Sequence, residues 1–159
     1  MHKLMLKLDG VVAWIEYRLL MLMMLALALI LATQVILRYF FNSPLFWAEE
    51  VSVQLLIAST FMGVSYLLYS RQLVRVDFIL LHLNDRIYWF TEKLLQLISL
   101  AVLCVICYFA TSWIMDPMTR IDVSPTTQLP RWYNYGLLVA SFYCMAFHQA
   151  VKLFSPTAK

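Results

Sequence analysis

Apolar residues fall into four long runs separated by shorter polar stretches. A helix needs about 20 apolar residues to cross a hydrocarbon core of about 30 Å, and each run is long enough. Tryptophan and tyrosine gather near the ends of the runs, as is typical of side chains at a membrane surface. The pattern therefore predicts an all-α integral membrane protein with four transmembrane helices. The predicted spans are residues 17–41, 44–69, 94–115 and 132–154.

The residues before the first run are amphipathic rather than uniformly apolar. At helical spacing, Leu4 and Leu8 share one face, while Lys3 and Lys7 lie on the other side. A short helix lying in the headgroup layer explains this pattern, so we expect an N-terminal interfacial helix over residues 1–16. An extension of the first span by several turns fits the same residues.

Two of the three connections are long enough to carry structure of their own. Residues 71–93 alternate apolar side chains with polar ones such as Arg75 and Asp77, which predicts a second interfacial segment. Residues 116–130 contain three prolines with Ser and Thr between them, which favours an extended, solvent-exposed loop. Because little chain is left outside the runs, residues 1–159 are expected to form a single four-helix membrane domain.

Composition agrees with a membrane protein and also predicts its orientation. The chain is 63% hydrophobic and 13% charged, whereas soluble domains carry about 25% charged residues. A net charge of +3 is too small to suggest a nucleic-acid partner. Of the twelve Lys and Arg residues, only Arg38, Arg120 and Arg131 fall on the side opposite the termini. The positive-inside rule therefore predicts that both termini lie in the cytoplasm.

The turn between the first two runs has the residues of a helical hairpin. Asn42 or Ser43 can cap a helix, and Pro44 suits the first helical position because its missing N–H would have no partner there. We therefore expect the first helix to end near Phe41 and the second to begin near Pro44.

Four polar side chains, Gln34, Arg38, Glu49 and Glu50, flank this turn at similar depth. Charge near lipid is costly, so the group needs a physical reason. One glutamate is expected to meet Arg38 across the hairpin, with Gln34 adding donors, as a clip that keeps two helices in register. Neighbouring residues point roughly 100° apart on a helix, so the side chain of the other glutamate points away from Arg38. That spare carboxylate is a candidate contact to another protein or an ion.

Small residues recur at intervals of four within the spans. Such spacing lets helix backbones approach closely in lipid, and it predicts a compact bundle. The stripes are Ala28 and Ala32; Ser59 and Gly63; and Gly136, Ala140 and Cys144.

The Cys-x-x-Cys spacing of Cys104 and Cys107 is the one pattern that suggests an enzyme. Four-helix membrane thiol oxidoreductases that pass electrons to quinone carry such a pair, which makes that class the alternative function. The pair lies in the middle of a span, where an unsolvated thiol is a poor nucleophile, and no second cysteine pair is present. Two small residues packed in a helix explain the spacing better.

The spans lack the features of a transport pathway or a catalytic centre. Only one histidine, His148, lies in a span, so no metal or cofactor site is expected, and a bundle-facing imidazole is the simpler interpretation. No carboxylate lies in the middle of a span, and only three glycines are present to interrupt helices. The sequence therefore predicts a non-enzymatic helper bundle that acts through its surfaces.

The motifs around the hairpin resemble the small membrane subunit of tripartite ATP-independent periplasmic (TRAP) transporters. The similarity extends to Arg75-Val76-Asp77 after the second span and to the lead into the fourth span. The matching residues near the hairpin are Gln34, Arg38, Tyr39, Asn42, Ser43, Pro44, Trp47, Glu49, Glu50, Phe61, Met62 and Gly63.

This resemblance implies a function that composition could not supply. Such subunits have four helices and pair in the bacterial inner membrane with a large elevator subunit, which holds the substrate and the coupling sodium. A periplasmic binding protein delivers a carboxylate substrate such as a dicarboxylate or a sialic acid. The small subunit would brace the large one and help to dock the binding protein. The candidate partner contacts are Trp47, Glu50, Arg120 and Asp122.

Overall fold

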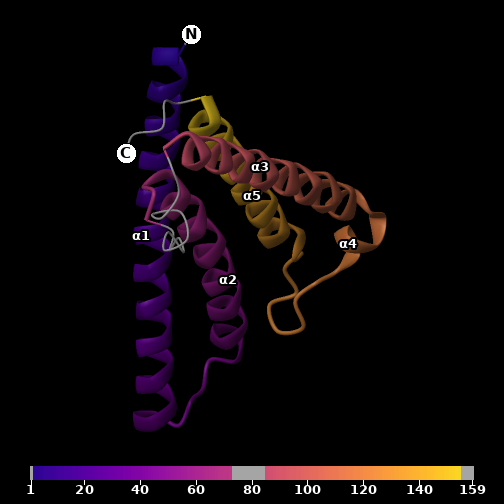
Figure 1. Cartoon of the computed structure of the whole chain (residues 1–159). Coiled ribbons are helices and arrows are strands. Elements are labelled where there is room, and N and C mark those ends of the chain that lie inside the picture. Colours follow the sequence, from indigo (N-terminus) through magenta and orange to yellow (C-terminus); the bar gives the residue numbers. More distant parts are fainter. Residues whose placement is uncertain (1, 73–84, 155–159) are drawn as a thin grey trace.

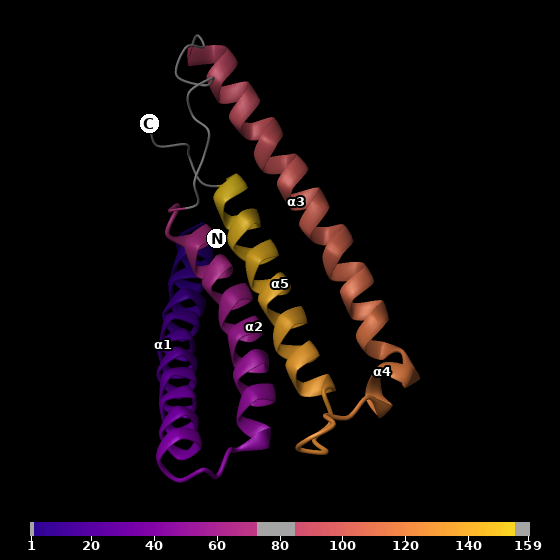
Figure 2. The same cartoon turned by 90° about the horizontal axis from the view of Figure 1, so that it is seen from below.

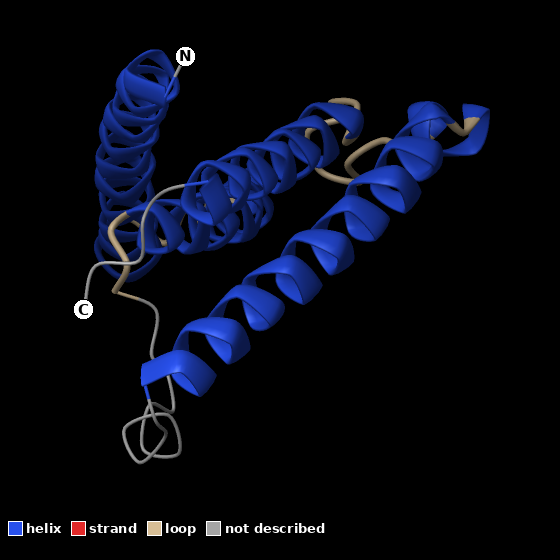
Figure 3. Cartoon of the chain, turned by 45° about the horizontal axis from the view of Figure 1, so that its top comes forward, coloured by secondary structure: helices blue, strands red, loops and turns tan. Residues whose placement is uncertain are grey.

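The computed structural model describes residues 2–72 and 85–154, and these residues are almost entirely helical (Figures 1 and 3). Four of the helices are long and apolar enough to cross a membrane, which confirms the predicted fold class. A fifth, short helix lies in the connection before the last span. The helices are α1 (His2–Phe40), α2 (Phe46–Tyr69), α3 (Asp85–Met115), α4 (Pro117–Ile121) and α5 (Trp132–Phe154).

The four long helices form an open row rather than the compact bundle that the small residues predicted. Figure 2 shows the order α1, α2, α5 and α3, in which each helix packs mainly on the next. The small residues explain part of this arrangement: Ser59 is buried, and Gly63 faces the side chain of Leu20 on α1. Ala28 and Ala32 on α1 are exposed, so that stripe is not buried against the other described helices.

The first helix continues without a break through the residues expected to form a separate interfacial helix. α1 contains 39 residues, about 58 Å of helix, so the extension of the first span is the form that the structure takes. Within this extension Asp9 and Glu16 are buried against α2 and α5. Gly10 faces the hydroxyl of Tyr69 on α2. These inward contacts hold residues 2–16 in line with the rest of α1.

The hairpin turn differs in detail from the capping that the sequence suggested. α1 ends at Phe40, and Asn42 takes a left-handed conformation with φ 50°, which Asn tolerates better than most residues. α2 begins only at Phe46, after Leu45, whose side chain makes no capping hydrogen bond. Asn42 therefore turns the chain after α1 instead of capping α2.

The two longer connections also contain more helix than expected. α3 begins at Asp85, nine residues before the predicted start of the third span, and the remaining interfacial segment, with Arg75-Val76-Asp77, lies outside the described residues. In the outer connection, the side chain of Asp116 accepts a hydrogen bond from the Met118 N–H and caps α4. The rest of that connection folds back on itself through a bridge between Val123 and Pro130.

Candidate functional site

The predicted clip at the hairpin forms between different partners. The Gln34 Nε2 donates to the Glu49 Oε1 at 3.1 Å, which joins α1 to α2. Arg38 is exposed, and within residues 2–72 and 85–154 no ion pair joins it to a carboxylate. The Gln34–Glu49 contact explains why: it puts Arg38 level with the residue before Phe46, beyond the start of α2. The Arg38 pairing is therefore replaced by an amide–carboxylate contact one turn deeper.

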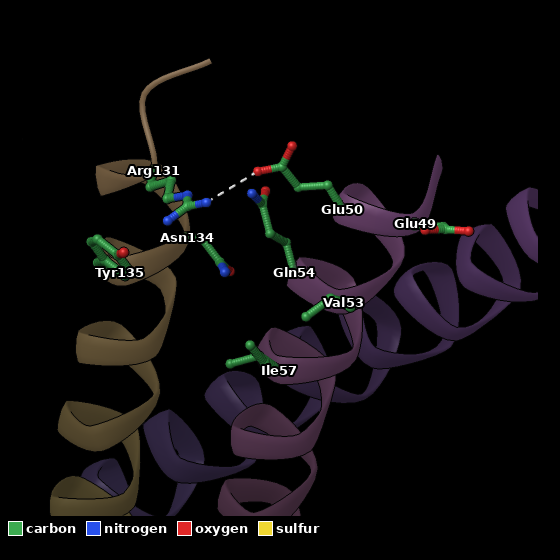
Figure 4. Close-up of a pocket in the computed structure, with 8 residues that line it drawn as sticks. All are labelled: Glu49, Glu50, Val53, Gln54, Ile57, Arg131, Asn134 and Tyr135. Atoms are coloured by element: carbon green, nitrogen blue, oxygen red, sulfur yellow. Dashed lines mark hydrogen bonds and ion pairs between the residues drawn. The ribbon is translucent and has the colours of Figure 1, made fainter. Parts of the chain in front are cut away.

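Glu50 points away from Glu49 and holds the outer loop instead (Figure 4). Its carboxylate lies 3.3 Å from the Arg131 Nη2, at the start of α5. It also accepts hydrogen bonds from the hydroxyls of Ser124 and Thr126 and from the Thr126 N–H. The hydrogen bond that the Arg131 guanidinium donates to Glu50 raises the pKa of Arg131. The second glutamate thus fastens α2 to α5 and to the loop between them.

The loop is held from its other side as well. The Arg131 Nη1 lies 3.6 Å from the Asp122 Oδ2, and the Tyr135 hydroxyl donates to the same oxygen at 2.9 Å. Ser124 is fully buried and receives a hydrogen bond from the Gln54 Nε2 at 3.1 Å. Sequence reasoning treated Arg131 only as a topological charge and missed Ser124 entirely. We call Glu50, Arg131, Asp122 and Ser124 the rim network.

An open pocket of about 450 Å³ lies beside the rim network, between α2 and α5 (Figure 4). Its polar and apolar residues come from both helices. They are Glu49, Glu50, Val53, Gln54, Ile57, Arg131, Asn134 and Tyr135.

The predicted partner contacts separate into exposed and engaged residues. Trp47 is 43% exposed and stands next to Phe46, which is 77% exposed, so an aromatic surface is available at the hairpin. Arg120 is also exposed. Asp122, in contrast, is engaged within the rim network together with Glu50. Trp47 and Arg120 are therefore the accessible members of the predicted set.

A second polar cluster, which sequence reasoning missed, lies toward the opposite end of the helices. His148 on α5 is 2% exposed, and its two ring nitrogens lie 2.6 Å from the Asp9 Oδ1 and 3.0 Å from the Glu16 Oε2. The Ser65 hydroxyl on α2 donates to the other oxygen of Glu16 at 2.6 Å. We call these four residues the buried cluster, and it joins α1, α2 and α5.

The buried cluster places Asp9 and Glu16 inside a long helix, where the sequence had put them in an interfacial helix before the first span. Asp9 and Glu16 are seven residues apart, which places both on one face of α1. The seven-residue spacing could have indicated a shared contact for the two carboxylates. It was not read in this way, because an interfacial helix over residues 1–16 would turn the face with Asp9 and Glu16 toward water. The prediction of a helix-facing imidazole at His148 agrees with the structure.

A third set of polar contacts attaches α3 to α5 at the same end. The Gln149 Nε2 donates to the Gln96 carbonyl at 3.2 Å, and the Gln96 Nε2 donates to the Glu92 Oε1 at 3.1 Å. The Lys93 ammonium donates to the Leu153 carbonyl at the end of α5. Residues that the sequence placed in a connection are therefore part of helix packing.

The two cysteines of the Cys-x-x-Cys pattern are both free. Cys104 is exposed on α3, while Cys107 is buried. The backbone carbonyl of Cys107 accepts a hydrogen bond from the Thr111 hydroxyl at 2.7 Å, which is an ordinary contact within a helix. The pair therefore has different surroundings for its two thiols.

Two comparisons with known proteins bear on this arrangement. The family model for the DctQ component of tripartite ATP-independent periplasmic transporters matches residues 10–158. The chain is also 28% identical over 93 residues to the sialic acid TRAP transporter permease protein SiaT of Haemophilus influenzae (strain 86-028NP). That match covers 58% of this chain and 15% of the relative's length. Since the family model spans nearly all of the sequence, the chain belongs to the DctQ component family of tripartite ATP-independent periplasmic transporters.

Proposed function

We propose that this chain is the non-catalytic small permease subunit of a sodium-coupled TRAP transporter. It braces a large elevator subunit in the bacterial inner membrane, and the large subunit carries both the solute and the coupling sodium. Its partners are that subunit, the surrounding lipid and a periplasmic substrate-binding protein.

The observation that carries this proposal is how the polar groups within the helices are used. Glu50 bonds to Arg131 and the outer loop, and His148 lies between Asp9 and Glu16. In a membrane, hydrogen bonds and close packing replace the hydrophobic drive for helix association. Polar groups that join helices to one another suit a rigid support.

The class of solute is part of the proposal and depends on the relative. The printed name of SiaT assigns sialic acid to that protein. For this chain we propose a carboxylate solute of the dicarboxylate or sialic acid type. The residues that select the solute would belong to the other subunits.

Orientation gives the two ends different roles. With both termini in the cytoplasm, the hairpin and the rim network face the periplasm. Trp47 and Arg120, which are exposed at that end, are the proposed contacts to the partner subunit or the binding protein. Asp122 supports them by holding the loop through Arg131.

Reconstitution tests the proposed function directly. Proteoliposomes would contain the large subunit alone, or with this chain, and would be given the binding protein, the solute and an inward sodium gradient. We expect uptake only when both subunits are present. Full sodium-dependent uptake by the large subunit alone would overturn the role of a required brace.

The competing function is that of a thiol–quinone oxidoreductase. One variant, measured for uptake and for thiol oxidation, distinguishes it from the transporter role. Replacing Cys104 and Cys107 with Ser removes both thiols of the pair while changing only one heavy atom at each position. Uptake that is unchanged in this variant supports the transporter role. Loss of a quinone-linked thiol oxidation in the variant would instead support the oxidoreductase.

A further inference from the structure

The pocket between α2 and α5 changes in polarity along its length. Glu50 and Arg131 lie together at its outer end, joined by their ion pair (Figure 4). The amides of Gln54 and Asn134 follow, and the side chain of Ile57 lies further along α2. The pocket therefore passes from charge to amide to aliphatic surface in the direction of the membrane interior.

The depth of this gradient is larger than one headgroup layer of a bilayer. Glu50 and Ile57 are seven residues apart, which corresponds to about 10 Å along the helix. A bilayer is about 40–45 Å thick with a hydrocarbon core of about 30 Å, which leaves roughly 5–8 Å for each headgroup layer. A pocket that begins near the start of α2 therefore spans a headgroup layer and the top of the hydrocarbon core.

The pocket presents both apolar surface and unused hydrogen-bonding groups. Val53 is 55% exposed and Ile57 is 39% exposed. The Asn134 side chain makes no hydrogen bond to another residue in the described part of the chain, and Gln54 uses only its amino group, toward Ser124. Polar groups at membrane depth are costly unless they are paired. The occupant should therefore offer polar atoms and an apolar chain together.

The charge around the pocket selects among such occupants. Glu50 and Arg131 cancel, while Asp122 beside Arg131 and Glu49 on α2 add negative charge at the same rim. This balance disfavours a ligand with a net negative charge. It suits a zwitterion whose phosphate lies near Arg131 and the positive N-terminal end of α5.

We propose that this pocket binds one zwitterionic phospholipid of the outer leaflet. Its phosphate lies at Arg131, its ester oxygens lie near the amide of Asn134, and one acyl chain lies against Val53 and Ile57. The bound lipid fills the space between α2 and α5 below the rim network. The inference concerns this chain in a bilayer and does not depend on the solute or on sodium coupling.

Lipid retention tests the proposal. The full chain would be placed in nanodiscs of equal parts phosphatidylethanolamine and phosphatidylglycerol, released into mild detergent, and weighed by native mass spectrometry. We expect one retained phosphatidylethanolamine. The variant Ile57→Trp fills the pocket and should abolish this retention. The control Val64→Trp introduces the same side chain on α2 at a residue with the same 39% exposure outside the pocket, and should leave retention unchanged.

A second variant keeps the proposal testable if Ile57→Trp does not fold. Asn134→Leu keeps the size of the side chain and removes one hydrogen-bonding group, so retention should fall by about fivefold, the effect of a typical net hydrogen bond. Preferential retention of phosphatidylglycerol, or an equal loss in Ile57→Trp and Val64→Trp, would overturn the proposal. So would wild-type retention in Asn134→Leu.

Photo-crosslinking distinguishes a lipid from a protein occupant. A benzoylphenylalanine at Val53, in cells that make the whole transporter, should yield an adduct with the mass of a phospholipid. The same group at Val64 provides the background. A cross-link to another protein at Val53, or no lipid adduct above that at Val64, would show that a lipid does not occupy the pocket.

Discussion

Replacing His148 with Leu should destabilise the protein more than any other change in the buried cluster. An ionised carboxylate only accepts hydrogen bonds, so the ring bonds to both Asp9 and Glu16 only when each of its nitrogens carries a hydrogen. A ring that donates through both nitrogens is a cation, and it lies between the two carboxyl groups. Leu has a similar size but leaves both carboxylates without their shared donor.

The expected magnitude follows from burial and from the number of bonds lost. The His148 side chain is 1% exposed and that of Glu16 is 4% exposed, so water cannot replace the ring at Glu16. Each hydrogen bond to a charged group contributes about 1.5–3 kcal/mol, and removing one partner of a buried ion pair costs about 3–5 kcal/mol. Two such bonds are lost here. We therefore expect His148→Leu to lower the free energy of unfolding by about 3–5 kcal/mol.

The neighbouring variants should show a definite order. Asp9→Asn leaves the His148–Glu16 pair with balanced charge, and the Asp9 side chain is 12% exposed, so this variant should be milder than His148→Leu. Adding Asp9→Asn and Glu16→Gln to His148→Leu removes the stranded charges and should restore part of the lost stability. Asp9→Asn therefore serves as the matched control.

Reversible unfolding by urea or by SDS in mixed micelles, followed by tryptophan fluorescence, measures these differences. The reasoning is refuted if His148→Leu costs less than Asp9→Asn. It is also refuted if the triple variant is less stable than His148→Leu alone, because the cost would then come from lost shape and not from unpaired charge.

Three further predictions concern the rest of the molecule. Arg131→Met removes the ion pair to Glu50, and amide hydrogen exchange in the outer loop should become faster by up to about fivefold, since the pair is partly exposed; unchanged exchange would contradict its role. Arg38→Ala should leave the thermal midpoint unchanged in a melting experiment, whereas a large fall would indicate a hidden partner. Cys104→Ser with Cys107→Ser should preserve transporter assembly on size-exclusion chromatography, and dissociation would show that the thiols matter.

The spans could be predicted because hydropathy reports depth directly. The last helix runs from Trp132 to Phe154 as expected, and α3 ends at the predicted Met115. The start of α3 was placed too late because Glu92 looked like part of a connection, whereas it is buried and accepts a hydrogen bond from Gln96. For α1, the amphipathic residues before Tyr17 fitted both an interfacial helix and an extension of the first span, and the structure shows the extension.

The hydrogen-bond partners within the site could not be predicted. The hydropathy of the sequence indicates how deep a residue lies along a helix, but not which helices pack beside it. Glu49 and Glu50 lie near the start of α2, yet Glu50 bonds to a residue 81 positions away. That contact exists because α5, and not α3, packs on the second face of α2. Nothing in the spacing of small residues distinguishes these two orders of helices. The assignment of Arg38 failed for a local reason, since it depended on where α2 begins.

The polar contacts join three helices of the open row, α1, α2 and α5, at both ends. The row is fastened at the hairpin end by Gln34–Glu49 and by the Glu50–Arg131 pair, and at the other end by the buried cluster around His148. Because lipid gives no hydrophobic drive for helix association, fastening both ends limits sliding and splaying more than contacts at one end could. A row also leaves two broad apolar faces, where a compact bundle of four helices would bury much of that area. Under the proposed function, one of these faces would lie against lipid and the other against the large subunit.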